Sequence, residues 1–418
     1  MKRILFLLIS LTLLCSCAAK TPPIPSDESI PAHGTEQLPA PQPIPPAEPE
    51  IPHEIPETIP EEPPIDPKAE TVTALLNTMT LEEKVGQLFF ARCPSVQQAE
   101  KIRAYHLGGY LLFTRDFQNT AGQWLTEQEF LQKIASYQAA SKIPLLIGVD
   151  EEGGSVARAS RNPNLFASKR KSPQTIHQTG GMAAVLQDTL DCNSRLLSLG
   201  INVNFAPVAD VSTNHSDFIY DRTLGLSAAE TAAYIEAVVA QMNQCSVNGE
   251  PARIGSVLKH FPGYGNNRDT HTGIAIDRRP YESFTESDFL PFLAGIRAGA
   301  GAVLVSHNIV ECMDTTLPAS LSAKVIGILR DELQFDGVIL TDDLAMDAVK
   351  QYAANGRAAV LAILAGNSMI VTTDFETQIE EVLFAVESGE ISPETIDKAV
   401  RYVLNWKYDL GLLQGELT

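Results

Sequence analysis

Val338-Ile339-Leu340-Thr341-Asp342-Asp343 is a short apolar run that ends in two carboxylates. Similar runs bounded by turn residues recur along the chain, at Gln87–Arg92, Gly108–Phe113, Leu145–Asp150, Asn202–Val208, Ser256–Phe261, Ala302–His307 and Ser368–Thr373. Helical patterns separate them, for instance at Glu127–Ala140, Ala229–Gln244 and Leu321–Leu333. Strands that alternate with helices predict a parallel sheet, and eight of them in about 345 residues predict an α/β fold with a single (β/α)8 barrel.

Polar residues at the ends of these runs support the barrel. Asp150, Lys259-His260, His307 and Asp342-Asp343 each end a run, and Asp210 lies two residues beyond another. A charge would be costly inside a packed barrel but is expected at the rim where the strands end, which is where such barrels build active sites. Carboxylates that only cap the following helices would explain one or two of these positions, but not five strands that end alike.

Three motifs carry the chemistry, and they lie at three different strand ends. They are Gly148-Val149-Asp150-Glu151-Glu152-Gly153-Gly154-Ser155-Val156-Ala157-Arg158, then Lys259-His260-Phe261-Pro262-Gly263-Tyr264-Gly265 with Asp269-Thr270-His271, and Leu340-Thr341-Asp342-Asp343-Leu344-Ala345-Met346. In this order they resemble glycoside hydrolase family 3, and specifically its β-N-acetylglucosaminidase branch. The resemblance runs from Met79 to Leu412 and therefore implies that 71–418 is the catalytic domain.

The resemblance implies a role for each matching residue. Asp342 corresponds to the nucleophile, His271 to the general acid/base and Asp269 to its partner. The residues that would hold the terminal sugar are Asp150, Arg158, Arg222, Lys259 and His260. For Arg158 and Arg222, a structural ion pair at the rim is the competing interpretation. The sequence departs from the family pattern at Glu151, Ser155 and Tyr264, where Gln, Arg and His are common.

The proton donor can also be argued from the residues themselves. Retaining glycosidases normally use two carboxyl groups about 5–5.5 Å apart, one of them as the acid/base. Only one strand-end nucleophile is evident here, because the neighbouring Asp343 should point to the opposite face of its strand. An imidazole exchanges protons near neutrality, and a carboxylate beside it stabilises its charged form. The Asp269-Thr270-His271 segment therefore supplies the expected donor, whereas His307 could equally bind a buried carbonyl group and stays outside the catalytic set.

The N-terminus indicates export. Lys2 and Arg3 precede an apolar stretch, 4–14, that is too short to span a bilayer comfortably. Ser16-Cys17 follows and resembles the lipobox of bacterial lipoproteins, so we expect 1–17 to be a signal peptide that ends at a lipidated Cys17. An ordinary signal peptide is the alternative. The expected location is extracytoplasmic, with the protein anchored by lipid to a bacterial cell membrane.

Composition changes completely after the signal segment. Residues 21–70 contain 16 of the 27 prolines and 11 acids against one base, so they supply ten of the net −20 charges. Such a segment buries too little apolar surface to offset its ordering entropy, which predicts that 18–70 is a disordered tether. A proline-motif ligand is the weaker alternative. No basic face suggests binding to nucleic acid.

Metal or cofactor chemistry is not indicated by the sequence. Cys93, Cys192, Cys245 and Cys312 form no CxxC pair, and the eight histidines form no HExxH pattern. Disulfide pairing of these cysteines stays open. We expect no metal, no cofactor, a monomer and a carbohydrate substrate.

The functional prediction is a retaining exo-β-N-acetylglucosaminidase that acts on peptidoglycan-type fragments through a covalent glycosyl-enzyme. The alternatives are a β-glucosidase or β-xylosidase, transfer of the sugar to phosphate, and a sugar-binding lipoprotein without catalysis. Binding alone needs no nucleophile, so Asp342, Asp269 and His271 together argue against the last.

Overall fold

The computed structural model describes residues 66–270, 273–352 and 357–413, and within them the eight predicted strands form one parallel sheet. The strands are β1 (Phe89–Arg92), β2 (Gly109–Leu112), β3 (Leu146–Val149), β6 (Val203–Asn204), β9 (Gly255–Phe261), β11 (Ala302–Val305), β13 (Val338–Thr341) and β14 (Ile370–Thr372). They pair in the order β13-β11-β9-β6-β3-β2-β1-β14. A parallel bridge from Leu340 to Met369 joins the two end strands. The predicted (β/α)8 barrel is confirmed.

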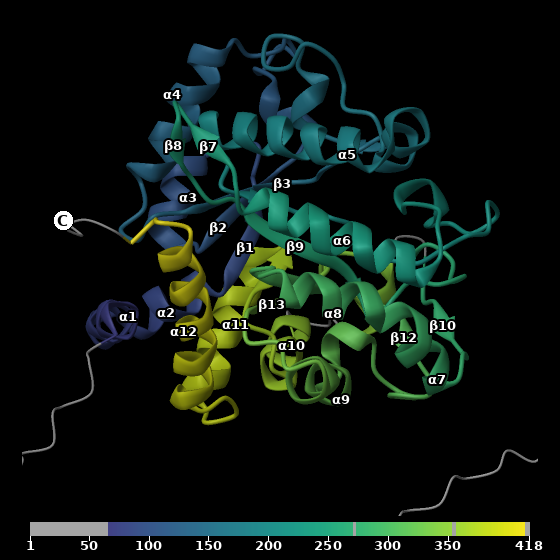
Figure 1. Cartoon of the computed structure of the whole chain (residues 1–418). Coiled ribbons are helices and arrows are strands. Elements are labelled where there is room, and N and C mark those ends of the chain that lie inside the picture. The colour runs from purple at the N-terminus through teal and green to yellow at the C-terminus, as the bar shows by residue number, and fades with distance from the viewer. Residues whose placement is uncertain (1–65, 271–272, 353–356, 414–418) are drawn as a thin grey trace, which may run out of the picture. The chain divides into compact units, whose positions relative to one another are not determined.

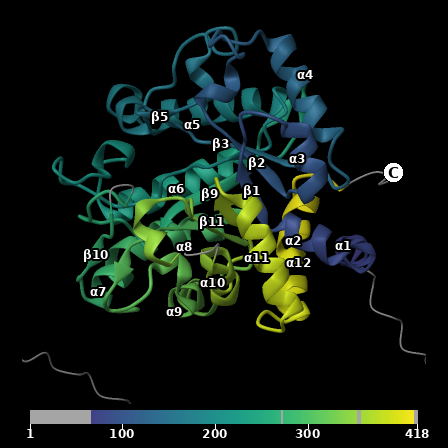
Figure 2. The same cartoon turned by 180° about the vertical axis from the view of Figure 1, so that it is seen from behind.

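Helices surround this sheet. They are α1 (Pro67–Thr78), α2 (Leu81–Gln87), α3 (Gln98–Tyr105), α4 (Glu127–Gln138), α5 (Pro173–Ser198), α6 (Ala228–Met242), α7 (Tyr281–Ser283), α8 (Phe289–Arg297), α9 (Ala323–Gly327), α10 (Arg357–Ala365), α11 (Phe375–Glu387) and α12 (Pro393–Asp409). Figure 1 shows α6 and α8 side by side over β9, and these two helices pack closely. Figure 2 shows α3 and α4 on the outer side of β1, β2 and β3.

Side chains fix several helix starts. The predicted capping box at Thr80 is present: its hydroxyl accepts from the Glu83 N–H, and the Glu83 carboxylate accepts from the Thr80 N–H. Thr126 and Ser227 begin α4 and α6 in the same way. These reciprocal bonds satisfy N–H groups that a helix cannot bond internally.

Two predicted boundaries are wrong. Residues 67–70, assigned to the tether, form the first turn of α1, because Asp66 caps the Lys68 N–H at 3.0 Å and Pro67 occupies a position where proline is tolerated. The single helix expected at Leu321–Leu333 is α9 followed by a π-helical turn, Ile328–Glu332. The predicted signal peptide, Cys17 and the rest of the tether lie outside the described residues.

The described residues contain no helix that is long and apolar enough to cross a membrane. The four cysteines after the signal segment are all free thiols, and only Cys312 is exposed. Burial raises the pKa of the Cys93 and Cys192 thiols to about 12, so both stay protonated at neutral pH.

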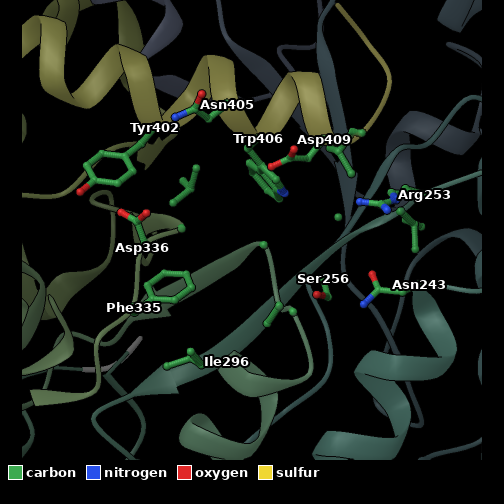
Figure 3. A pocket seen from close by; sticks show the side chains of 18 of the residues that line it. Asn243, Arg253, Ser256, Ile296, Phe335, Asp336, Tyr402, Asn405, Trp406 and Asp409 are labelled. Atoms are coloured by element: carbon green, nitrogen blue, oxygen red, sulfur yellow. The ribbon is translucent and has the colours of Figure 1, made fainter. Parts of the chain in front are cut away.

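Trp406 of α12 closes the end of the barrel at which the strands begin. A Cβ atom added at Gly301, the residue before β11, would lie 2.3 Å from the Trp406 Nε1 atom, and Gly255 of β9 meets the same indole ring. Figure 3 shows Trp406, Tyr402 and Asp409 of α12 beside a pocket of about 400 Å³ at this end. In this fold, the end at which strands begin serves stability rather than catalysis.

Candidate active site

The opposite end of the barrel carries the predicted site residues. Phe90 and Phe205 fill the barrel interior, where their rings meet edge to face with centroids 5.1 Å apart. Gly148 lies against both rings, and a Cβ atom there would come within 2.7 Å of each. Since strand side chains alternate, Arg92 and Asp150, two residues further on, face the same way at the rim.

Four charged side chains at the rim form one network, in which Lys259 and Glu152 are buried and Asp150 and Arg222 are partly exposed. The Lys259 Nζ atom lies 2.7 Å from Asp150 Oδ1 and 2.5 Å from Glu152 Oε1. The Arg222 guanidinium binds both oxygens of Glu152, at 2.7 and 3.0 Å. Burial alone would favour a neutral Glu152, but the charges of Arg222 and Lys259 outweigh it and lower the pKa of this carboxyl. The network therefore presents fixed charges to a ligand.

The tautomer of His260 follows from its two neighbours. The Arg222 Nη2 atom, which can only donate, lies 3.0 Å from His260 Nε2, so this ring nitrogen accepts. The Nδ1 atom then donates to Asp210 Oδ2 at 2.7 Å. His260 is neutral in this arrangement and orients Arg222. The ion pair with Glu152 is the competing interpretation of Arg222, and it is observed; sugar binding by Arg222 stays a prediction.

Lys259 and His260 are neighbours in β9, yet both face this network. Pairing between β9 and β11 explains how: Lys259 pairs with Leu304, and Phe261 pairs with Val305, so the register shifts by one residue. The Lys259-His260 peptide bond is cis. The shift in register accompanies the contacts that Lys259 and His260 make with Asp150 and Asp210.

Asp342 follows β13 at the same rim. Its N–H donates to the Val305 carbonyl oxygen at 2.9 Å, which fixes the backbone beside β11. The adjacent Asp343 is used structurally: its carboxylate accepts from the Ala345 N–H at 3.0 Å and from the Thr373 hydroxyl at 3.2 Å. Asp342 Oδ1 also accepts a hydrogen bond, from the Asp343 N–H at 2.8 Å, so both carboxylates are engaged and the assignment of Asp342 as the nucleophile stays a prediction from the family resemblance.

His307 supports the segment that carries Asp342. A carbonyl oxygen only accepts, so the His307 Nε2 atom donates to the Asp343 carbonyl at 3.0 Å. The Nδ1 atom of the ring contacts the Ser320 hydroxyl at 2.7 Å. The binding of a backbone carbonyl, one of the two roles predicted for His307, is the one observed.

Asp269 and Thr270 lie in the loop that follows β9, whereas His271 lies outside the described residues. Thr270 is buried, and its N–H and hydroxyl both contact the Tyr264 hydroxyl. Burial, with smaller contributions from the carboxylates of Asp342 and Asp269, raises the pKa of Tyr264 to about 12.

Arg158 is placed differently from the other predicted sugar-binding residues. Its guanidinium carbon lies 5.5 Å from the centroid of the Phe113 ring, and that of Arg92 lies 4.1 Å from the same centroid. The Nε atoms of both arginines are buried and have no hydrogen-bond partner among the described residues. The guanidinium groups of Arg92 and Arg158 therefore both lie against the Phe113 ring, near the ends of β1 and β2.

Sequence reasoning did not assign a role to several residues of this rim. They are Arg92, Phe113, Glu152, Asp210 and Tyr264. Arg92 ends a strand as the assigned residues do, and that signal alone could have identified it. Glu152 could not be separated from Glu151, whose buried carboxylate instead accepts from the N–H groups of Arg158, Ala159 and Ser160.

A match to a known family decides the classification. Residues 80–406 match the Glycosyl hydrolase family 3 N terminal domain. The chain belongs to this family. The predicted membership and the prediction of a glycoside hydrolase are confirmed.

Relatives place this family 3 chain in the β-hexosaminidase branch. It is 30% identical over 307 residues to the beta-hexosaminidase of Nitrosomonas eutropha, a match that covers 70% of this chain and 82% of the relative. A beta-N-acetylglucosaminidase structure from Paenibacillus superposes with a TM-score of 0.72 at 30% identity and covers 81% of this chain. The match spans 64% of that longer Paenibacillus chain. The Beutenbergia cavernae beta-N-acetylhexosaminidase gives 0.67 at 27% identity and matches over 98% of its own length.

Proposed function

We propose that this family 3 hydrolase removes terminal β-linked N-acetylglucosamine with retention of configuration. The observation that carries the proposal is the position of Asp342 at a rim that also holds the Asp150–Lys259–Glu152–Arg222 network. The names of the Nitrosomonas and Paenibacillus relatives support the choice of sugar. The charges of Asp150, Lys259, Glu152 and Arg222 would hold one terminal sugar in a fixed orientation, as an enzyme that acts on chain ends requires.

The first chemical step forms a glycosyl-enzyme. A carboxylate oxygen of Asp342 bonds to the anomeric carbon while the bond from that carbon to the leaving oxygen breaks. The imidazolium of His271 gives its proton to the leaving oxygen. Asp269 stabilises the charged ring before the transfer, because a nearby carboxylate favours the protonated imidazole.

The second step returns the enzyme to its starting state. Neutral His271 takes a proton from water, and the water oxygen bonds to the anomeric carbon as the Asp342 carboxylate leaves. Two displacements restore the β configuration. Asp150 and Glu152 are unsuited to the proton transfer, since Lys259 binds both and the pKa of Glu152 is lowered.

The site predicts the result of removing the nucleophile. We expect Asp342→Ala to lower the release of 4-nitrophenol from its N-acetyl-β-glucosaminide by about a thousand-fold or more, because no covalent intermediate can form. Asp397→Ala, which changes a partly exposed carboxylate on α12, is the matched control. Unchanged turnover in the Asp342 variant would overturn the assignment.

The same assay separates the competing activities. Matched glucosides and xylosides without the acetamido group test the β-glucosidase and β-xylosidase alternatives; a Cellulomonas fimi relative, 27% identical, is named beta-N-acetylglucosaminidase/beta-glucosidase. Added phosphate tests transfer to phosphate, which would give a sugar phosphate in place of the free sugar. Binding of the sugar without any product would indicate a non-catalytic protein.

We further propose that the natural substrates are peptidoglycan-type fragments and that the enzyme acts outside a bacterial membrane, anchored by lipid at Cys17. The short apolar leader and the Ser16-Cys17 pair support the anchor. We expect Cys17→Ala to move the expressed protein from the membrane fraction to the soluble fraction, while Cys15→Ala leaves it bound. Equal fractionation of the two variants would instead favour an ordinary signal peptide.

A further inference from the structure

Tyr264 connects the start of the loop that follows β9 to Thr270, further along the same loop. Its side chain is 2% exposed, and its hydroxyl lies 2.7 Å from the Thr270 hydroxyl. The Thr270 N–H donates to the same phenol oxygen at 3.0 Å. The phenol thus makes two contacts with Thr270, six positions further along the chain, and Thr270 directly follows Asp269.

The ring of Tyr264 is itself held by the site. The backbone N–H of Tyr264 donates to Asp210 Oδ1 at 2.7 Å. The other oxygen of that carboxylate, Oδ2, accepts from the His260 ring. The His260 ring meets the Tyr264 ring nearly perpendicularly, with centroids 5.5 Å apart. Asp210 therefore fixes His260 and Tyr264 at once.

A second set of contacts anchors the same loop from the other side. The Asn267 side-chain amide donates to the Tyr264 carbonyl at 2.8 Å and to Asp277 Oδ2 at 2.7 Å. Arg279 binds Asp277 and Asp288, and its guanidinium lies against Gly265. These contacts fix the backbone of 263–267, and they therefore also fix the position of the Tyr264 side chain.

We propose that Tyr264 is a positioning residue that holds the Asp269-Thr270 segment within the loop that follows β9, an inference that rests on the proposed function. An imidazole at this position would change its charge near neutral pH. A buried phenol keeps its proton throughout the neutral range, so it donates to the Thr270 hydroxyl while it accepts from the Thr270 N–H. Asp269, the proposed partner of the proton donor, directly precedes Thr270 in the chain, so we expect the contact to affect proton transfer rather than sugar binding.

The test is Tyr264→Phe, measured on a series of N-acetyl-β-glucosaminides whose leaving groups range from good to poor. Poor leaving groups need protonation in the transition state, whereas good ones do not. We expect kcat/KM to fall about ten-fold or more on the poorest leaving group and about two-fold or less on the best. His271→Ala gives the reference pattern, with the same selectivity and a larger loss.

Matched controls separate positioning from a general effect on folding. Tyr281→Phe removes a phenol hydroxyl that donates to Glu332 away from the site, so it should leave the whole series unchanged. Thr270→Val removes the partner hydroxyl alone and should reproduce the selective loss, with the double variant no slower than the slower single one. If Tyr264→Phe does not fold, the Thr270→Val result decides.

Two failures are distinguishable. Equal slowing on good and poor leaving groups by Tyr264→Phe, or no slowing at all, overturns the positioning role. If Asp342→Ala retains wild-type turnover, the proposed function itself fails, whatever the Tyr264 variant does.

Discussion

The buried carboxylate of Glu152 binds two cations at this rim and is the centre of the charged network. It separates two cations, Lys259 and Arg222, that would otherwise face each other in a poorly solvated region. Its side chain is 4% exposed, so water cannot replace it. The ion pairs are therefore mutually dependent, and removal of the central charge is more damaging than the loss of one surface pair.

We expect Glu152→Gln to lower the free energy of unfolding by about 3–5 kcal/mol at pH 7, because it leaves buried cations without compensation. The pKa of Glu152 is lowered in the folded protein, so its stabilisation is complete above the unfolded pKa and is lost as the pH falls toward the folded pKa. The difference from wild type should accordingly shrink below pH ~4.5. Urea unfolding from pH 3 to 8 measures it. Glu100→Gln, at an exposed pair, should stay within about 0.5 kcal/mol at every pH.

Individual side-chain roles were harder to predict than their location. Asp150, Lys259, His260 and Asp342 lie at the rim, as the apolar runs predicted. Asp150 and Asp342 directly follow β3 and β13, and Lys259 and His260 lie in the last three residues of β9. The partners that fix them come from turns and loops. Asp210 binds a histidine 50 positions away, and no periodic pattern records such a pairing.

Trp406 of α12 packs against Gly255 of β9 and against Gly301, the residue before β11. This contact tests whether the end of the barrel at which the strands begin contributes to stability and not to catalysis. We expect Gly301→Ala to lower the free energy of unfolding by about 1–3 kcal/mol, since the new Cβ would overlap the Trp406 ring. The kcat of the folded fraction should not change. Thermal melts and active-site-normalised rates check both expectations.

Gly327→Ala is the matched control for this change. It lies in α9, and its new Cβ would be 3.7 Å from the Asp331 carboxylate, an ordinary contact. Alanine favours helix over glycine by up to about 1 kcal/mol, so this variant should be as stable as wild type or more so. Equal destabilisation by both substitutions would contradict the role given to Trp406.

Strands were predictable because each is an apolar run with a polar end, whereas short irregular elements were not. The hairpin of β4 (Glu151–Gly153) and β5 (Val156–Ala157) lies within the first of the three motifs, where no strand was predicted beyond Asp150. The π-helical turn after α9 keeps a helical sequence pattern, so periodicity alone could not reveal it. Composition likewise placed the end of the tether four residues late, because capping by Asp66 is a local contact.

Eight strands in one chain predict a closed barrel, but the number of strands alone does not show that the sheet closes. Closure depends on contacts between the first and last strands, such as the Phe89–Ile370 pairing of β1 with β14. These contacts join residues about 280 positions apart, and only the alternation of strands and helices along the chain anticipates them. Lys407 lies on α12, which packs against α2, the helix that leads into β1.

Lys407 leads to a prediction for the pH dependence of global stability. It is fully buried, its Nζ atom donates to Gln87 Oε1 at 2.6 Å, and burial lowers its pKa to about 7. Between pH ~7 and ~10 the unfolded chain therefore holds one more proton at this lysine than the folded protein does. The lysine consequently favours folding more as the pH rises, by about 1.4 kcal/mol per pH unit.

Lys407→Met isolates this contribution. It leaves the Gln87 carbonyl without its donor at every pH, which is a constant cost, while it removes the titration. The difference in the free energy of unfolding between wild type and variant should therefore change steadily, in favour of wild type, as the pH rises from 7 to 9. Lys398→Met changes an exposed lysine on the same helix and should give a difference independent of pH. A flat difference for Lys407→Met as well would mean that this ammonium group keeps its charge inside the folded protein.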